Sequence, residues 1–153
     1  MSDKRFNVRV YGIVINQHDE LLVSDELIQG IQFTKFPGGG LEWGEGTRAC
    51  LQREFMEELE QEVEVLEHYF TTDYFQQSAF KDSDQLISIY YKVRLLGELN
   101  FPTSSTPFNF PDDVGNQFEV QRWIPLSALS PDDFKWPVDK IVAGILRADY
   151  LNG

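Results

Sequence analysis

The residues best suited to chemistry lie in the stretch FPGGGLEWGEGTRACLQREFMEELEQEV, which spans residues 36–63. Glu54, Glu57 and Glu58 are crowded there, and three consecutive glycines precede them. On a helix these carboxylates share an arc roughly 100° wide, and like charges so placed repel by a few tenths of a kcal/mol per pair. A divalent cation would offset this repulsion, because Mg²⁺ and Mn²⁺ accept carboxylate oxygens as ligands.

An ordinary solvated face of a surface helix is the alternative explanation for this acidic cluster. The glycines Gly38, Gly39 and Gly40 favour a ligand site, since they let the backbone turn tightly and expose its amides and carbonyls. They match neither a P-loop, because no Gly-Lys-Ser/Thr follows, nor a dinucleotide-binding fingerprint. Residue types and spacing alone therefore leave both explanations open.

The same stretch resembles the box of the Nudix hydrolase family: G, five residues, E, seven residues, R-E, an apolar residue, any residue, E-E, any residue, G and an apolar residue. The matching positions are Gly39, Glu45 and the run REFMEE at residues 53–58, so every charged position agrees. Glu60 and Gln61 depart from the closing glycine and apolar residue. Because a glycine there suits a left-handed helix end, we predict that the helix is either strained or re-routed at Glu60.

The resemblance implies a divalent-metal-dependent pyrophosphohydrolase. Members of that family use Mg²⁺ or Mn²⁺ to hydrolyse nucleoside diphosphates linked to another moiety, such as an NTP, a dNTP or an NDP derivative, by water attack at phosphorus. Carried over by position, the metal ligands are Glu54, Glu57, Glu58 and the carbonyl of Gly38. Glu54 is also the candidate general base.

Two further site residues are implied in the same way. Arg53 and Glu45 would orient the carboxylates through charge-assisted hydrogen bonds, which makes them part of the catalytic group. Substrate contacts are assigned to Gly39, Gly40, Trp43 and Glu119. Trp43 would stack on a base, although packing against its own loop is the expectation that we favour. Glu119 is the first candidate for a functional acid outside the box, and Asp112 and Asp113 of loop 101–117 are the next candidates. The alternative for each of them is an ordinary surface acid with no role in the reaction.

Markers downstream of the box leave the substrate open. The chain lacks the proline of ADP-ribose hydrolases, the tyrosine of diadenosine polyphosphate hydrolases and the coenzyme A signature. Its tail is similar to that of MutT-type members and suggests a nucleoside triphosphate, but the asparagine that relatives use to read guanine is replaced near Val138. Two alternatives from other classes are a catalytically inactive Nudix domain that binds a nucleotide or NDP-sugar, and a structural domain with an incidental acidic helix.

Composition limits the partners. The chain has 153 residues, 42% of them hydrophobic, which suits a single domain over residues 1–153 with a real core. A net charge of −12 would repel a nucleic-acid backbone, and solubility is its simplest cause.

The N-terminus lacks the apolar run of a signal peptide or membrane span, and the single Cys50 excludes a disulfide framework. We expect a cytoplasmic protein that binds a small-molecule nucleotide and neither nucleic acid nor membrane. A homodimer stays open, since relatives are often dimers.

Hydrophobic patterning predicts the elements that position these residues. Residues 6–15 read as a strand with a bulge or change of face at Gly12, joined by a hairpin to a second strand from Leu21. A further short strand leads into the glycines. A helix is expected from a cap at Thr47 to about Leu59, with an apolar side. That side comprises Ala49, Leu51, Phe55, Met56 and Leu59.

The second half of the chain reads as more strands and a closing helix. Long strands are expected at residues 63–75 and 85–96, a loop at 101–117 and a last strand at 118–126. A helix follows at 137–151, with Ile141, Val142, Ile145 and Leu146 on its apolar stripe. This order predicts the α/β class, as an α/β/α sandwich with a mixed β-sheet, which is the Nudix fold that the resemblance implies.

Overall fold

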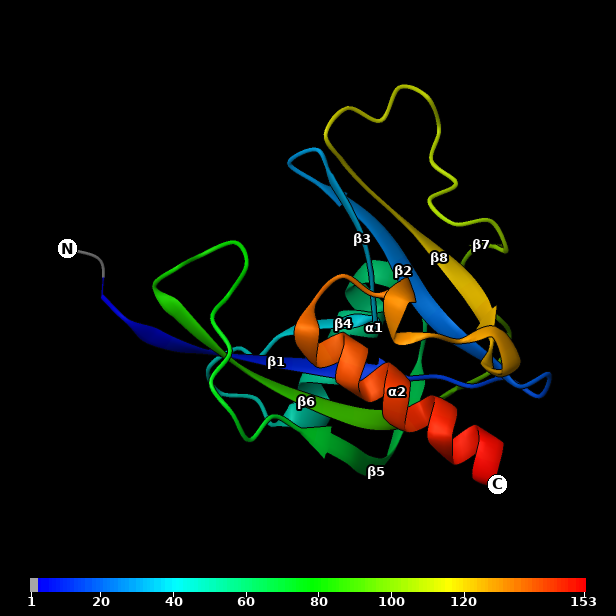
Figure 1. Cartoon of the computed structure of the whole chain (residues 1–153), viewed down its shortest axis with the longest axis horizontal. Coiled ribbons are helices and arrows are strands. Elements are labelled where there is room, and N and C mark those ends of the chain that lie inside the picture. Colours follow the sequence, from blue (N-terminus) through cyan, green and yellow to red (C-terminus); the bar gives the residue numbers. More distant parts are fainter. Residues whose placement is uncertain (1–2) are drawn as a thin grey trace. The chain divides into compact units, whose positions relative to one another are not determined.

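The computed structural model describes residues 3–153, which group into two compact units, each with a four-stranded sheet and a helix (Figure 1). The first unit runs to Ile13 and resumes at Gly38–Glu98, and the second comprises Val14–Pro37 and Leu99–Gly153. Between residues 3 and 153, no helix combines the length and apolar character needed to cross a membrane.

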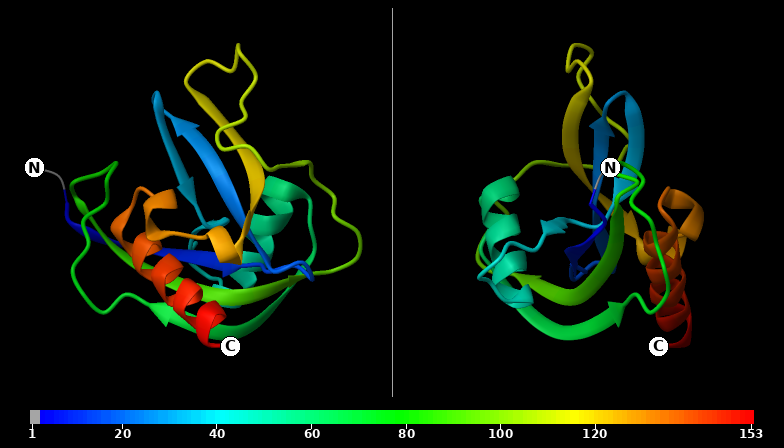
Figure 2. Two further views of the ribbon diagram at one scale, coloured as in Figure 1. Left: turned by 45° about the vertical axis from the view of Figure 1, so that its right-hand side comes forward. Right: turned by 90° about the vertical axis from the view of Figure 1, so that its left-hand side faces the viewer.

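The first unit contains a sheet of order β4-β1-β6-β5. Its elements are β1 (Arg5–Ile13), β4 (Gly38–Gly40), α1 (Thr47–Leu59), β5 (Val63–Thr71) and β6 (Asp84–Leu95). β1 pairs parallel to β6 and antiparallel to β4, so the sheet is mixed. α1 packs against β4, β1 and β5 (Figure 2). Phe55 on the helix and Val10 and Tyr90 on the strands are almost completely buried, and they form part of this unit's core.

The second unit contains a sheet of order β3-β2-β8-β7, in which β7 and β8 are parallel and the other pairs antiparallel. Its strands are β2 (Glu20–Ile28), β3 (Ile31–Lys35), β7 (Thr103–Ser104) and β8 (Gln117–Pro125). Two 3₁₀ turns, η1 (Leu126–Ala128) and η2 (Pro131–Asp133), pack against α2 (Pro137–Asn152). The rings of Phe36 and Phe134 stack with their centroids 4.9 Å apart. The α/β class and the mixed strand directions are therefore confirmed, with the strands shared between two sheets.

The prediction that the first two strands pair along their length as a hairpin is wrong. An antiparallel bridge does join Ile15 to Leu21, but β1 and β2 belong to different sheets. The main partner of β1 is β6, a distant parallel strand that a local pattern cannot reveal. The bulge at Gly12 is also wrong, because the register with β6 continues through it. A Cβ at Gly12 would lie 2.9 Å from the ring of Phe55, so the glycine makes room for the helix.

The helix α1 has the predicted length but a different cap and a different buried face. Gly46, not Thr47, is the N-cap residue, and no side chain caps the helix; the Thr47 hydroxyl instead lies 2.7 Å from the Tyr91 hydroxyl. Met56 and Ala49 are exposed, whereas Cys50 is buried beside the other core positions of the helix. The buried arc is therefore turned toward the acidic side of the helix.

The C-terminal helix α2 follows the predicted span, and its apolar stripe needs one correction. Val142 and Leu146 are buried as expected, together with Val138 and Ala143. Ile141 is 40% exposed and lies outside this stripe. The buried face is formed by residues spaced three and four apart, such as Val138, Val142 and Leu146. Ile141 lies beyond the edge of this face.

Candidate active site

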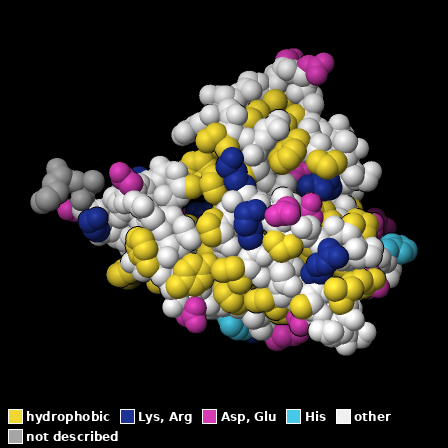
Figure 3. All heavy atoms as spheres, viewed as in Figure 1, with side chains coloured by type: hydrophobic (Ala, Val, Ile, Leu, Met, Phe, Trp, Pro, Cys, Tyr) yellow, Lys and Arg dark blue, Asp and Glu magenta, His cyan; other side chains and the backbone are white. Residues whose placement is uncertain are grey.

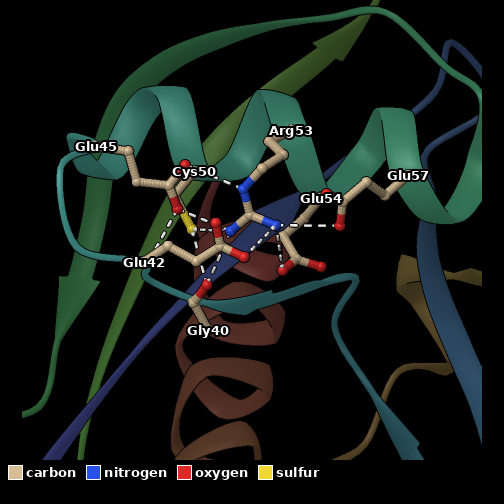
Figure 4. A network of polar contacts seen from close by, with 7 residues as sticks. All are labelled: Gly40, Glu42, Glu45, Cys50, Arg53, Glu54 and Glu57. Carbon is tan, nitrogen blue, oxygen red and sulfur yellow. Dashed lines mark hydrogen bonds and ion pairs between the residues drawn. The ribbon is translucent and has the colours of Figure 1, made fainter.

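Arg53 is the centre of a polar network on α1 and on the loop before it (Figure 4). Its Nη2 and Nε donate to the two carboxylate oxygens of Glu45, over 2.7 and 3.0 Å. Such a paired, charge-assisted contact fixes both groups in one plane. The hydrogen bond from Arg53, followed by one from the Glu42 amide, lowers the pKa of Glu45 to about 2. The bond to Glu45 is also the main cause that raises the pKa of the guanidinium.

The same guanidinium contacts two carboxylates of the acidic cluster. Its Nη1 donates to Oε1 of Glu54 and to Oε2 of Glu57, each over 3.1 Å. Its Nη2 also donates to the carbonyl of Gly40 over 3.0 Å. Arg53 thus contacts both Glu54 and Glu57, through one oxygen of each carboxylate. It does not bind the second oxygen of either carboxylate.

The glycine strand β4 makes space for Glu54. The Glu54 side chain is only 12% exposed, and a Cβ at Gly39 would lie 2.4 Å from its carboxylate carbon. Gly38 has φ +146°, and a Cβ there would come within 2.1 Å of the Val10 carbonyl oxygen. A larger residue at these two positions would displace either the Glu54 carboxylate or the neighbouring strand β1. The glycines are thus required by the close approach of β4 to β1 and α1.

The three box glutamates differ in their surroundings. Glu57 has a side chain that is 58% exposed, and Glu58 is also exposed, whereas Glu54 is packed against β4. Over residues 3–153, no group of three or more His, Cys, Asp or Glu side chains is close enough together to hold a metal ion. The oxygen-only donors of the helix, and the space that Gly39 leaves for Glu54, nevertheless have the chemistry that a hard divalent cation needs.

The predicted strain at the end of the helix is confirmed. Glu60 has φ 51° and ψ 37°, a left-handed conformation, and its amide donates to the Met56 carbonyl over 3.0 Å. Gln61 takes the place of an apolar residue yet is fully buried. Its side-chain amide donates to the carbonyls of Leu96, over 2.9 Å, and Glu62, over 3.2 Å. The buried glutamine therefore joins the end of α1 to the residues that follow β6.

Two other residues of this unit have clear environments. Cys50 is buried and its thiol contacts the Gly40 carbonyl over 3.5 Å. Burial raises the pKa of Cys50 to about 12, so this thiol is a packed residue and no nucleophile. Trp43 is fully exposed, so the expectation that it packs against its own loop is wrong. The loop turns at Gly44, with φ +96°, and leaves the indole in solvent.

Glu119 lies in the second unit, on β8, and is half-buried rather than an ordinary surface acid. Burial, and next the charge of Glu26, raises the pKa of Glu119 to about 7. The aspartates of loop 101–117, Asp112 and Asp113, are exposed. Sequence reasoning missed Glu26, which has no motif around it and becomes a neighbour of Glu119 only through the pairing of β2 with β8. It also missed Glu42, although its position inside the box loop was a signal.

The helix α1 carries the run REFMEE and packs against the glycine strand β4 in a mixed α/β fold, which is the arrangement that the Nudix resemblance leads us to expect for a hydrolase of phosphoric anhydrides. The NUDIX domain family matches residues 5–144, so the chain belongs to the Nudix family. This match includes residues of both units. No curated protein sequence gives a significant match to the chain.

Solved structures support the Nudix fold. The E. coli ORF135 protein aligns with a TM-score of 0.68 at 19% identity, over 95% of this chain and 91% of its own. A MutT protein from Methanosarcina mazei Go1 aligns with a TM-score of 0.68 at 12% identity, over 98% and 99%. An ADP-ribose pyrophosphatase from Streptococcus suis 89-1591 aligns with a TM-score of 0.58 at 15% identity, over 96% and 92%. At these identities the likeness concerns the fold.

Proposed function

We propose that the protein is a divalent-metal-dependent pyrophosphohydrolase, which cleaves a nucleoside diphosphate linked to another moiety by attack of water at phosphorus. The observation that carries this proposal is the Arg53 network. One guanidinium binds carboxylate oxygens of Glu45, Glu54 and Glu57, so four charged positions of the box form one connected cluster. This connected arrangement around one arginine favours a functional site over an incidental acidic surface, on which the carboxylates would be dispersed in solvent.

The metal would be held by the carboxylates of Glu54, Glu57 and Glu58, with the Gly38 carbonyl as a further ligand. When bound, Mg²⁺ or Mn²⁺ supplies positive charge for the phosphates and activates water. The donor chemistry supports this assignment, because carboxylate and carbonyl oxygens are the ligands that these ions prefer. Arg53 orients two of the acids, and Glu45 in turn fixes the plane of the guanidinium.

The remaining roles concern the proton and the substrate. Glu54 is the candidate general base that takes a proton from the attacking water. Its carboxylate is held by Arg53 and faces Gly39, so it is positioned before substrate binds. Gly39 and Gly40, with Trp43 and Glu119, are assigned to substrate binding. The fully exposed indole of Trp43 supports a stacking contact with a base.

The base and the leaving moiety stay open, and we propose only the class of substrate. Structures similar to this one include proteins named MutT and ADP-ribose pyrophosphatase, so both dNTPs and ADP-ribose belong in a substrate screen. A cytoplasmic location and a homodimer also stay predictions. Light scattering coupled to size-exclusion chromatography would decide the oligomeric state.

The experiment that tests the function is a screen of pure protein with dNTPs, NDP-sugars, ADP-ribose and dinucleotides, with and without Mg²⁺. We expect phosphate or nucleotide release that requires the metal and that falls at least about 100-fold in Glu57→Gln. Glu67→Gln removes a carboxylate outside the box whose side chain is 66% exposed, against 58% for Glu57, and should retain full activity. An absence of turnover for all substrates, with Glu57→Gln behaving like the wild type, would reject the enzyme. Binding without turnover would support the inactive binding module instead.

A further inference from the structure

Two carboxyl groups of the second unit lie side by side on one face of its sheet. Glu26 on β2 and Glu119 on β8 are paired directly across the antiparallel ladder, so their side chains project in the same direction. Glu26 is 6% exposed and Glu119 is half-buried. Two ionised carboxylates in this arrangement repel each other, and burial strengthens the repulsion.

The surroundings of the two carboxyl groups are unequal. Lys35 on β3 places its ammonium 3.4 Å from Oε2 of Glu26, and the two side chains are only 12% and 8% exposed. The Ser24 hydroxyl donates to the same oxygen over 2.9 Å. A cation and a hydroxyl donor both stabilise a negative charge on Glu26, because charge-assisted hydrogen bonds favour the ionised carboxylate.

The causes that act on the pKa of Glu119 favour its neutral form on balance. Burial and the neighbouring Glu26 raise its pKa, whereas Lys35 and a hydrogen bond with Gln121 lower it by less. The charged and titratable groups that act on Glu119 are thus Glu26 from β2 and Lys35 from β3. The net result is a pKa of about 7, so the proton of Glu119 exchanges near neutral pH.

We propose that Glu26 and Glu119 form a carboxyl pair with one shared proton, in which Glu26 keeps the negative charge and Glu119 gains and releases the proton. The step is a simple ionisation: the O–H bond of Glu119 breaks, the proton passes to solvent, and the carboxylate keeps the electron pair. Glu26 is then a positioning residue, which acts by setting the acidity of Glu119.

This pair gives the protein an acid–base group matched to neutral pH. Hydrolysis of an anhydride by water releases a proton, and a carboxylate that titrates near neutrality is suited to accept it. A role for Glu119 in the reaction rests on the proposed function, whereas the shared proton does not. If the ionised form is the active one, kcat/KM falls as the pH drops through the titration of Glu119.

The shared proton can be tested without any substrate. The protein is labelled with ¹³C at the glutamate carboxyl carbons, and their resonances are followed against pH by NMR. We expect one resonance with a midpoint near 7, which is absent in Glu119→Gln and so is assigned to Glu119. In Glu26→Gln the midpoint falls by about 1 unit or more, because the repelling charge is gone. Glu20→Gln, on the same strand, should leave the midpoint unchanged.

A second variant covers the case in which Glu26→Gln does not fold. Lys35→Met removes the cation that favours ionisation, so the midpoint of Glu119 should rise. A wild-type midpoint near the ordinary value of 4.5, or one that neither variant moves, would overturn the pair.

The kinetic readout separates the pair from the proposed function. In the wild type, the acidic limb of the kcat/KM profile should share the NMR midpoint of Glu119 and move with it in Glu26→Gln. If the NMR titration behaves as expected but the profile does not follow it, the role in the reaction is overturned while the pair stands. If no anhydride is hydrolysed, the proposed function fails and the NMR titration still decides the pair.

Discussion

Arg53 connects the acids of the site because a guanidinium can bind several carboxylates at once. Its planar fork binds Glu45 through two nitrogens, and its third nitrogen reaches both Glu54 and Glu57. The arginine therefore offsets part of the repulsion between Glu54 and Glu57, whose clustering the sequence alone explains either by a bound divalent cation or by a solvated acidic face. A cation that binds the same helix would share these carboxylates with Arg53.

Replacing Arg53 with lysine should disrupt the site while keeping the charge. A single ammonium cannot hold Glu45 in two places and also reach Glu54 and Glu57. We expect kcat to fall by about 10- to 100-fold, as for other residues that orient metal-binding groups. Arg94→Lys, which alters an exposed pair with Glu64, is the matched control. Steady-state kinetics of both variants would settle the matter, and an unchanged kcat in Arg53→Lys would refute this role.

The pKa of Glu45 makes a second prediction at the scale of one residue. Its folded-state pKa is about 2, below the ordinary value of 4.5, so the ionised carboxylate favours the folded state. That contribution is present above 4.5 and is lost as the pH falls toward 2. Glu45→Gln should therefore lower Tm relative to the wild type at neutral pH, with a difference that shrinks in acid. Thermal unfolding across this range measures it, and a pH-independent difference would contradict the assignment.

At the scale of elements, the end of α1 shows how a departure from a family pattern is accommodated. Glu60 adopts the left-handed conformation that the family's glycine would adopt without strain. Gln61 is buried in place of an apolar side chain, and its amide satisfies two carbonyls that include that of Leu96. The helix is strained at its end and is not re-routed.

Restoring the glycine should stabilise the protein. Glu60→Gly removes the steric cost of a left-handed non-glycine residue, about 1 kcal/mol, although the added freedom of the unfolded chain offsets part of it. We expect a higher denaturant midpoint in equilibrium unfolding. Glu64→Gly, in the extended strand β5, has no such strain to relieve and should lower the midpoint. A lower midpoint for Glu60→Gly would show that the glutamate side chain contributes more than its strain costs.

Local patterns predict elements well and their partners poorly. The span of α1 was predictable because apolar residues recur at helical spacing, and the spacing of the charged box residues pointed to the family. The pairing of β1 with β6 was not, since the partners lie far apart in the sequence. The same limit hid Glu26, because a strand register brings it beside Glu119. The exposure of Trp43 was missed because aromatic residues are more often packed than left in solvent.

At the scale of the molecule, the net charge of −12 is a cost that counter-ions reduce. On the face in Figure 3, acidic side chains are dispersed among basic and apolar ones. Added salt should therefore raise Tm modestly by screening repulsion between charges at all these sites. A specific divalent site would add a further increase that depends on particular carboxylates.

Comparing Mg²⁺ with NaCl at equal ionic strength isolates that specific increase. Binding to the folded state alone stabilises it by RT ln(1 + [L]/Kd), about 2.7 kcal/mol at a Mg²⁺ concentration 100 times Kd. We expect Mg²⁺ to raise Tm beyond the NaCl control in the wild type and in Glu67→Gln. In Glu54→Gln and Glu57→Gln the excess should vanish while the response to NaCl persists, because only the ligands have changed. If Mg²⁺ and NaCl act identically on the wild type, the acidic face of α1 is only a contributor to net charge.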